Sequence, residues 1–420
     1  MGRHDQYHRA LLSLMMCLLF IAIGPAHAQD AEVDETSCAI SAKPTALQRL
    51  DDGRNEFREQ IGLAVWSPNG ERLAVWMRRT TNMQGIDDLE NWLQVWDAVR
   101  GVKIVELQFN QYYPANITWA ADNAKLALAA RNRVYIWEGG HNWSSTSLEI
   151  DHSHRFEQVV WSADGTQLFT TNVINQRFVP SRVYPYANIL RRWDATTGEL
   201  LEESEAFEQV FVTTWQSQIV AITRLSEDVS VRVLASDEVL FSLPNAYFAG
   251  SLFTDNKQRV ATVTVEDYVA YIAIWDLSTQ QALLEISGKY FTLVNFAPNG
   301  DLFQISLLGG GSEIWELETG RRFELPLIGS YQFDGAQWSP DSQCAIFRGV
   351  LPPGYASDFG MAPDEVIALW SAAEPERVRL LDGATTWFWG ALGGGVAWSP
   401  DGRRFTSVDE QGVFKIWQRE

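Results

Sequence analysis

Apolar and polar residues alternate in short runs along most of the chain, and tight turns separate these runs. The alternation is clear in "ERLAVW" (71–76) and "GTQLFT" (165–170), and it returns in "FKIWQ" (414–418) close to the last residue. A period of two residues is typical of β-strands that bury one face. The pattern therefore predicts an all-β protein built from many short strands.

One hairpin unit recurs along the chain. Its clearest copies are "VWSPNGERLAVW" (65–76), "VWSADGTQLFTT" (160–171), "QWSPDSQCAIF" (337–347) and "AWSPDGRRFTSV" (397–408). In each copy a strand ends in an aromatic residue, and a turn rich in Pro, Asn, Asp and Gly reverses the chain into a second strand. Weaker copies lie at 118–129, 252–263 and 295–306, and the weakest lies at 214–224.

A second signature follows each hairpin, namely a strand that ends in Trp and leads through a turn into another apolar strand. Examples are "LQVWDAVRG", "LRRWDATTG" and "IAIWDLSTQ"; only the fourth unit, "VSVRVLASDE", lacks the Trp. The first aromatic residue of each four-strand unit falls at Trp66, Trp119, Trp161, Trp215, Phe253, Phe296, Trp338 and Trp398. Most of these spacings agree with the roughly 40–45 residues expected of one propeller blade.

The repeated units resemble the blades of WD-repeat (WD40-like) β-propellers, and the "WSPDG" form is also similar to TolB-type propellers. Trp-Asp pairs stand only at 96–97, 193–194 and 275–276, and no Gly-His pair opens a unit. The resemblance covers about residues 45–420 and implies a single propeller. Eight copies predict eight four-stranded blades, and the weak fourth unit leaves seven blades as the alternative.

The last unit ends one strand short, at Trp417, so its sheet lacks an outer strand. "TALQRLDDG" (45–53) precedes the first blade and has no other use, and we expect it to join the last blade and close the ring. This arrangement brings Cys38 close to Cys344, and we expect a disulfide between them in an oxidising compartment. The alternative is two unpaired thiols.

The first residues have the features of a secretory signal. Arg3 and Arg9 precede the apolar run "ALLSLMMCLLFIAIG" (10–24), and "AHA" (26–28) fits a cleavage site. We therefore predict a cleaved signal peptide (1–28), an N-terminal extension (29–44) and a propeller domain (45–420). The apolar run is shorter than the roughly 20 residues that cross a bilayer. We expect an exported protein, periplasmic or extracellular, with no membrane span in the mature chain.

The formal net charge of −20 opposes binding to phosphate backbones, so nucleic acid is not an expected partner. Three units are longer than the others, and their extra residues fall between the second and third strands, at 77–92, 174–187 and 349–366. Two connections between blades, 110–115 and 383–394, are rich in aromatic residues. Equivalent connections leave a propeller at one face, and loops on a rigid scaffold commonly bind partners. The candidate binding residues on this face are Arg78, Arg79, Trp92, Tyr112, Tyr113, Arg177, Phe178, Arg182, Tyr184, Tyr186, Tyr355, Phe359, Trp387 and Trp389. For each residue taken singly, packing of the loops onto the ring is the favoured role.

No assembled catalytic motif stands in the chain, which has no Gly-x-Ser-x-Gly, no His-Glu-x-x-His and no Cys-x-x-Cys. "DHSH" (151–154) has the residue types of a metal site, but a structural hydrogen-bonding role is favoured, and we predict no catalytic residue, metal or cofactor. The sequence thus favours a non-enzymatic scaffold that binds a protein or glycan. The alternative is a propeller enzyme of lactonase, lyase or quinone-dependent dehydrogenase type, with carboxylates lining the central channel.

Overall fold

The structure is a computed structural model. It describes residues 38–40, 45–49, 59–80, 89–109, 114–139, 143–150, 154–174, 188–225, 228–254, 256–266, 269–287, 291–307, 312–325, 332–350, 365–381, 396–408 and 413–419. In this part of the chain all regular elements are β-strands, and no helix is long and apolar enough to cross a membrane.

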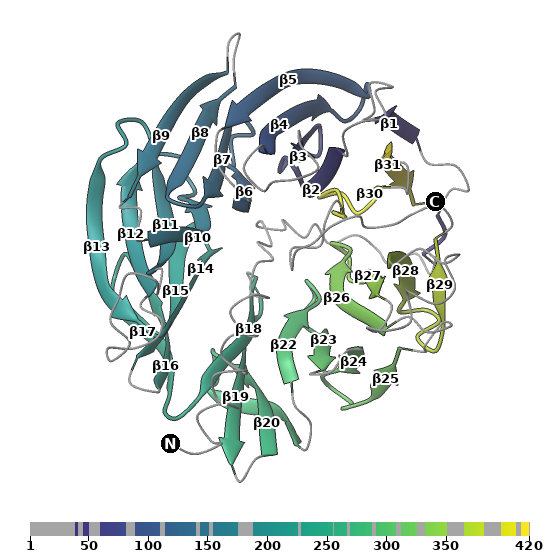
Figure 1. Cartoon of the computed structure of the whole chain (residues 1–420). Helices are drawn as coiled ribbons and strands as arrows, with labels where there is room; N and C mark the ends of the chain where they lie inside the picture. Colours follow the sequence, from purple (N-terminus) through teal and green to yellow (C-terminus); the bar gives the residue numbers. More distant parts are fainter. Residues whose placement is uncertain are drawn as a thin grey trace.

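The strands form sheets that are arranged as a ring around a common axis (Figure 1). In chain order, the first four sheets comprise β2 (Glu59–Trp66), β3 (Arg72–Thr80), β4 (Leu89–Asp97) and β5 (Val102–Phe109); β6 (Pro114–Trp119), β7 (Lys125–Ala130), β8 (Arg133–Glu138) and β9 (Ser144–Glu149); β10 (His154–Trp161), β11 (Gln167–Ile174), β12 (Asn188–Asp194) and β13 (Leu200–Phe207); β14 (Gln209–Trp215), β15 (Gln218–Leu225), β16 (Asp228–Val233) and β17 (Glu238–Leu243). In each sheet the first strand lies nearest the axis, and the strands follow one another outward in sequence order (Figure 1).

The next three sheets repeat this order. They comprise β18 (Tyr247–Phe253), β19 (Gln258–Glu266), β20 (Val269–Asp276) and β21 (Gln281–Ser287); β22 (Phe291–Phe296), β23 (Leu302–Leu307), β24 (Ser312–Glu316) and β25 (Arg322–Glu324); β26 (Gln332–Trp338), β27 (Cys344–Val350), β28 (Glu365–Ser371) and β29 (Val378–Leu380). Paired strands are antiparallel throughout, as short connections between neighbours require.

The remaining sheet joins the two ends of the chain. Its order is β1 (Thr45–Arg49), β31 (Val413–Gln418) and β30 (Arg404–Val408), and β1 pairs with β31 through Thr45 opposite Ile416 and Arg49 opposite Val413. The prediction that the N-terminal strand completes the last repeat is confirmed. Because the expected outer strand of this repeat comes from the other end of the chain, the ring is closed by strand pairing.

The number of four-stranded blades is seven, which agrees with the alternative reading of the repeats. Eight four-stranded blades are not confirmed, because the last repeat contributes three strands among the described residues. On the inner side of β30 the structure shows a single bridge, Trp398 to Phe405, and residues 382–395 before it lie outside the described part.

Indole hydrogen bonds link neighbouring sheets of the ring. In five repeats the first Trp donates through Nε1 to a backbone carbonyl in the preceding repeat, at 2.9–3.3 Å: Trp66 to Ala397, Trp119 to Val65, Trp161 to Thr118, Trp338 to Asn295, and Trp398 to Gln337. Trp215 of the weak fourth unit donates instead to Thr254 of the following sheet (3.1 Å). The aromatic residue at this position therefore packs and also fixes the spacing between blades.

The turns of the Trp-Ser hairpins are stabilised by their own side chains. Ser67 Oγ donates to Asn69 Oδ1 (2.8 Å) and accepts from the backbone N–H of Arg72 (2.9 Å). Ser339 does the same with Asp341 (2.6 Å) and the N–H of Cys344 (2.9 Å). These bonds explain the recurring order Trp-Ser-x-Asp/Asn, since each polar side chain satisfies a backbone group in a tight turn.

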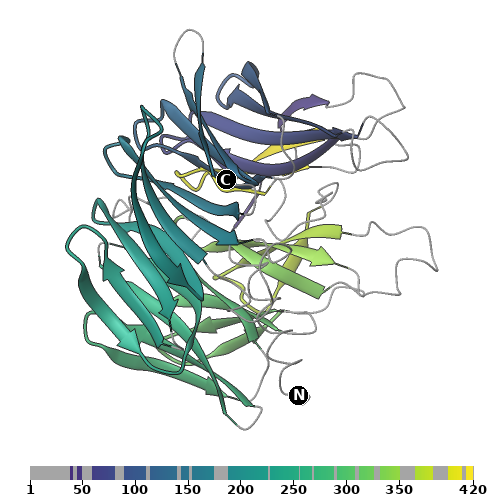
Figure 2. The same ribbon diagram turned by 60° about the vertical axis from the view of Figure 1, so that its left-hand side comes forward.

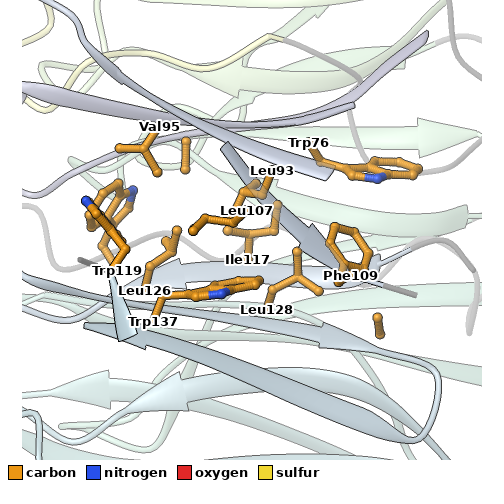
Figure 3. Packing of buried hydrophobic residues seen from close by; sticks show 13 residues of the cluster. Trp76, Leu93, Val95, Leu107, Phe109, Ile117, Trp119, Leu126, Leu128 and Trp137 are labelled. Atoms are coloured by element: carbon orange, nitrogen blue, oxygen red, sulfur yellow. The ribbon is translucent and has the colours of Figure 1, made fainter. Parts of the chain in front are cut away.

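Apolar side chains fill the space between adjacent sheets. Figure 3 shows Leu93 and Val95 of the first sheet packed toward Ile117, Leu126 and other side chains of the second. Trp76 at 1% exposure is one of the largest buried side chains of the molecule. Since each sheet has apolar residues on both faces, a single blade cannot bury its own core, and the ring is the unit of stability.

The predicted disulfide is present between Cys38 and Cys344, whose Cα atoms are 5.9 Å apart. Two residues beyond Cys38, Ile40 forms a bridge with Arg419 at the end of the chain. The covalent bond therefore ties the residues ahead of β1 to the seventh sheet, which is the neighbour of the sheet that β1 completes.

Candidate functional site

The three long insertions leave the ring at equivalent strand ends. The paired strand residues that flank them are Thr80 with Leu89, Val173 with Asn188, and Val350 with Glu365. Each pair joins the second and third strands of its sheet. Because every sheet repeats the same strand order around the ring, equivalent connections leave at the same face. We call this face the insertion face, and we call the opposite face, which carries the hairpin turns, the turn face. Figure 2 shows the ring of sheets turned by 60° from the view of Figure 1.

Of the predicted binding residues, three lie in the described part of the chain. Arg78 and Arg79 lie in β3 opposite Asn91 and Glu90 of β4, close to the first insertion, and the structure describes their backbone alone. Trp92 is 8% exposed and packs in the core cluster that contains Trp66 and Phe414. Trp92 is thus a packing residue between the first sheet and the closing strands.

The other candidates lie outside the described residues, so their contribution to binding stays a prediction. They are Tyr112, Tyr113, Arg177, Phe178, Arg182, Tyr184, Tyr186, Tyr355, Phe359, Trp387 and Trp389.

On the turn face, a hollow of about 450 Å³ lies where the last repeat meets the first sheet. Its walls are the β4–β5 turn (98–101), the turn residues Asp401, Arg403 and Arg404, and the end of β31 with Arg419. With Arg100 in the first wall, four arginines face one aspartate among the lining residues. We call this site the arginine hollow; it is locally basic in a chain whose net charge is −20.

Two of these arginines are held in place by the ring. Arg404 donates to the carbonyl oxygens of Gly70 (2.8 Å) and Ala98 (3.3 Å), and its guanidinium lies 4.8 Å from the centre of the Trp66 ring. Arg419 pairs with Asp341 of the seventh sheet, and its side chain is 12% exposed. Both guanidinium groups are therefore held by contacts within the ring.

The other two arginines of the hollow are accessible. Arg100 is 80% exposed and forms an ion pair with Asp97 at 3.3 Å, which is a weak interaction at a solvated surface. Arg403 is exposed, and its side chain makes no ion pair within the described ranges. This site is not visible in the sequence, because its arginines lie far apart in the chain; the only local signal is the Arg403–Arg404 pair after the last turn.

A second hollow of about 450 Å³ lies between the first and second sheets on the turn face, lined by Arg72, Asn123 and Trp143 among others. Arg72 donates to the carbonyl of Asn123 (3.0 Å), and the Asn123 side chain accepts from the N–H of Asn69 (2.8 Å). The polar groups of this hollow bond across the two sheets. It is therefore a site of blade packing.

Acidic groups near the axis are sparse in the described part. Glu157 lies on β10, the innermost strand of its sheet, and burial raises the pKa of its carboxyl above the usual value, although Arg155 opposes the shift. Among the described residues no group of three or more His, Cys, Asp or Glu is placed to hold a metal ion. His154 is in β10, while His141 and His152 lie outside the described residues.

Comparison with known proteins gives similarity in fold. The computationally designed Ika8 protein aligns with a TM-score of 0.56 at 16% identity, over 86% of this chain and 96% of that one. The C-terminal WD40 domain of Sif2 aligns with a TM-score of 0.54 at 12% identity, over 86% and 97%. A chain of the mitotic checkpoint complex aligns at 18% identity over 74% and 90%, with a TM-score of 0.48.

No family model and no curated protein sequence matches this chain. At identities of 12% and 16%, the structural similarity defines the fold alone. The chain is thus similar to WD40 propellers in architecture, as the repeat signatures predict.

Proposed function

We propose that this protein is an exported, non-enzymatic propeller that binds a protein or glycan partner through its insertion face. The observation that supports this proposal is the common origin of the three insertions at equivalent strand ends. In the described ring, by contrast, recurring aromatic positions such as Trp66 and Trp119 are used for packing and for hydrogen bonds between blades. The repeats therefore supply the scaffold, and the irregular additions are the segments left for recognition.

Aromatic and Arg residues give these additions the chemistry for a contact surface. The insertion 174–187 contains Tyr184 and Tyr186, and the connection 383–394 contains Trp387 and Trp389. Tyr and Trp supply a large contact area at a low cost in side-chain entropy, and they are enriched among residues that dominate binding energy.

The test is replacement of Tyr184, Tyr186, Trp387 and Trp389 together by alanine. Wild type and variant are used as bait in a cross-linking pull-down from the envelope or secreted fraction of the source cells. We expect the partners captured by the wild type to be lost. A matched control carries Arg100→Ala and Arg403→Ala on the turn face and should retain those partners. Unchanged capture by the fourfold variant would refute the assignment of the face.

Export is tested separately. Fractionation followed by N-terminal sequencing should place the protein outside the cytoplasm with Gln29 as its first residue. The non-enzymatic assignment predicts no stabilisation by calcium, quinones or small sugars in a thermal-shift screen. A large upward shift with one of these compounds would favour the enzyme alternative.

A further inference from the structure

The disulfide between Cys38 and Cys344 lies in the interior of the ring. Cys344 has no exposed surface, and Cys38 is 6% exposed. Both belong to a core cluster whose other members come from two neighbouring sheets, namely the seventh sheet and the sheet β1–β31–β30, which we call the closing sheet. The seventh sheet contributes Ile346, Ile367 and Leu369, and the closing sheet contributes Phe405 and Trp417. The sulfur atoms are therefore covered where these two sheets meet, and we call this boundary the disulfide junction.

Burial limits the chemistry of this bond. A disulfide exchanges with a thiol when a thiolate attacks one of its sulfur atoms, so the thiolate must reach that atom. Cys344 cannot move outward alone, because it pairs with Ser371 of β28, and its N–H and C=O groups bond to Ser339. Access to the sulfur atoms thus requires the closing sheet to separate from the seventh sheet.

The disulfide junction lies at a part of the ring that is suited to local opening. The closing sheet contains the first and last described strands, β1 and β31, and has three strands among the described residues where the other sheets have four. Across the junction, Trp398 Nε1 donates to the carbonyl of Gln337 (2.9 Å), and Arg419 forms an ion pair with Asp341. Elements at chain ends open at a lower free energy than the rest of a structure, so this junction should open more readily than the ring unfolds.

We propose that the Cys38–Cys344 bond forms and exchanges only in an open form of the ring, in which the closing sheet has separated from the seventh sheet. In the oxidising direction, the two thiols react with a disulfide donor, either a small-molecule disulfide or a thiol–disulfide oxidoreductase. The protein loses two electrons and two protons, and the donor leaves as two thiols. Because the donor cannot reach buried thiols, oxidation precedes closure of the junction, and closure then protects the bond from reductants. This order of steps is independent of the insertion face and of what that face binds.

The first test measures reduction of the folded protein. It uses the chain that begins at Gln29, in which Cys38 and Cys344 are the only cysteines. Dithiothreitol is added at about pH 8, where a good fraction of a thiol is ionised. Samples are quenched with iodoacetamide, and mass spectrometry follows the alkylated cysteines. We expect reduction to be about a hundredfold or more slower than that of oxidised glutathione, whose disulfide is exposed. Equal rates would show that the bond is accessible in the closed ring and would overturn the proposal.

A pair of variants distinguishes local opening from unfolding of the whole ring. The junction variant carries Trp398→Phe and Arg419→Ala, which remove the indole bond and the ion pair across the disulfide junction. It should be reduced about tenfold faster than the wild type. The matched control carries Trp161→Phe and Lys257→Ala, which remove the same two kinds of contact at other boundaries between sheets. We expect the control to be less stable in urea but to be reduced at the rate of the wild type. Equal acceleration of both variants, or no acceleration of the junction variant, would contradict the proposal.

The wild type alone gives a second test that needs no substitution. Reduction is measured in urea below the unfolding transition. Local opening exposes little surface, so the rate should rise only slightly with urea, whereas a rise as steep as that of global unfolding would rule out local opening.

The oxidising direction is tested by refolding the reduced chain. Oxidised glutathione is added either at the start of refolding or after the tryptophan fluorescence has reached its final value. Early addition should give the disulfide about threefold faster or more. Equal rates of oxidation after early and late addition would refute the proposed order of steps.

Discussion

Breaking the disulfide tests the covalent part of ring closure. Cys38 and Cys344 are separated by 306 positions in the sequence. In the chain-entropy model, a disulfide that closes a loop of about 300 residues raises the free energy of the unfolded chain by about 5–6 kcal/mol. Native disulfides typically stabilise the folded state by about 2–4 kcal/mol. We expect replacement of both cysteines by serine to lower the free energy of unfolding by about 2–5 kcal/mol.

The loss should begin at the closing strand. Once the bond is absent, β1 (Thr45–Arg49) is held mainly by its pairing with β31, because the residues before it are no longer tied to the seventh sheet. The short β1 can then detach without unfolding the other sheets, and this exposes the outer edge of β31. Hydrogen exchange measured by mass spectrometry should therefore increase first in residues 413–418.

The assay compares three samples by urea unfolding, followed through tryptophan fluorescence. They are the oxidised wild type, the wild type reduced with dithiothreitol, and the Cys38→Ser/Cys344→Ser variant. The reduced wild type controls for the serine at position 344, which introduces a hydroxyl into an apolar cluster. If all three samples unfold at the same urea concentration, with the same exchange at 413–418, the role assigned to the disulfide is wrong.

Three further substitutions test single interactions. Trp66→Phe removes the indole bond to Ala397 across the closing junction and should cost about 1–2 kcal/mol in urea unfolding, with Trp215→Phe as the comparison. The backbone N–H groups of the β12–β13 turn lower the pKa of Asp194. The contribution of its carboxylate to folding stability is therefore complete above pH about 4 and is lost as the pH falls through the lower pKa of the folded state. When the unfolding temperature is measured from pH 7 to pH 3, Asp194→Asn should lose less stability than the wild type. Burial raises the pKa of the Glu157 carboxyl in the folded state. The folded state therefore becomes less stable as the pH rises from the pKa of the unfolded chain to the higher pKa of the folded one. Glu157→Gln should raise the unfolding temperature at pH 7 but not at pH 3.

The repeated part of the fold could be predicted from the sequence because its interactions are local. The turn after Trp66 needs Ser67 and Asn69 at fixed positions, and both are visible as a motif. The pairing of β1 with β31 was predictable as well, since the last unit lacked one strand and one strand was left over at the other end. The blade count was harder, because the weak fourth unit forms a complete sheet, whereas the last unit, with its clear "AWSPDG" turn, forms a three-stranded sheet among the described residues.

The arginine hollow could not be predicted from local patterns. Arg100 follows a Trp-Asp turn, Arg404 follows a hairpin turn, and Arg419 is next to the last residue, so each has an ordinary local explanation. Only closure of the ring brings these side chains together. Trp92 was a candidate for the binding face because it ends an insertion, with packing as the favoured role of any single candidate; the pleat of β4 directs its side chain into the core.

The junction that joins the last repeat to the first sheet uses the same contact as the internal boundaries between blades. At an internal boundary a basic side chain after the hairpin turn donates to a backbone carbonyl in the next unit, as Arg72 does to Asn123 and Lys125 to Gly165. At the closing junction Arg404 is anchored on Gly70 and Ala98 of the first sheet while its neighbour Arg403 remains exposed. Closure of the ring therefore repeats the regular contact between blades with residues that come from opposite ends of the chain.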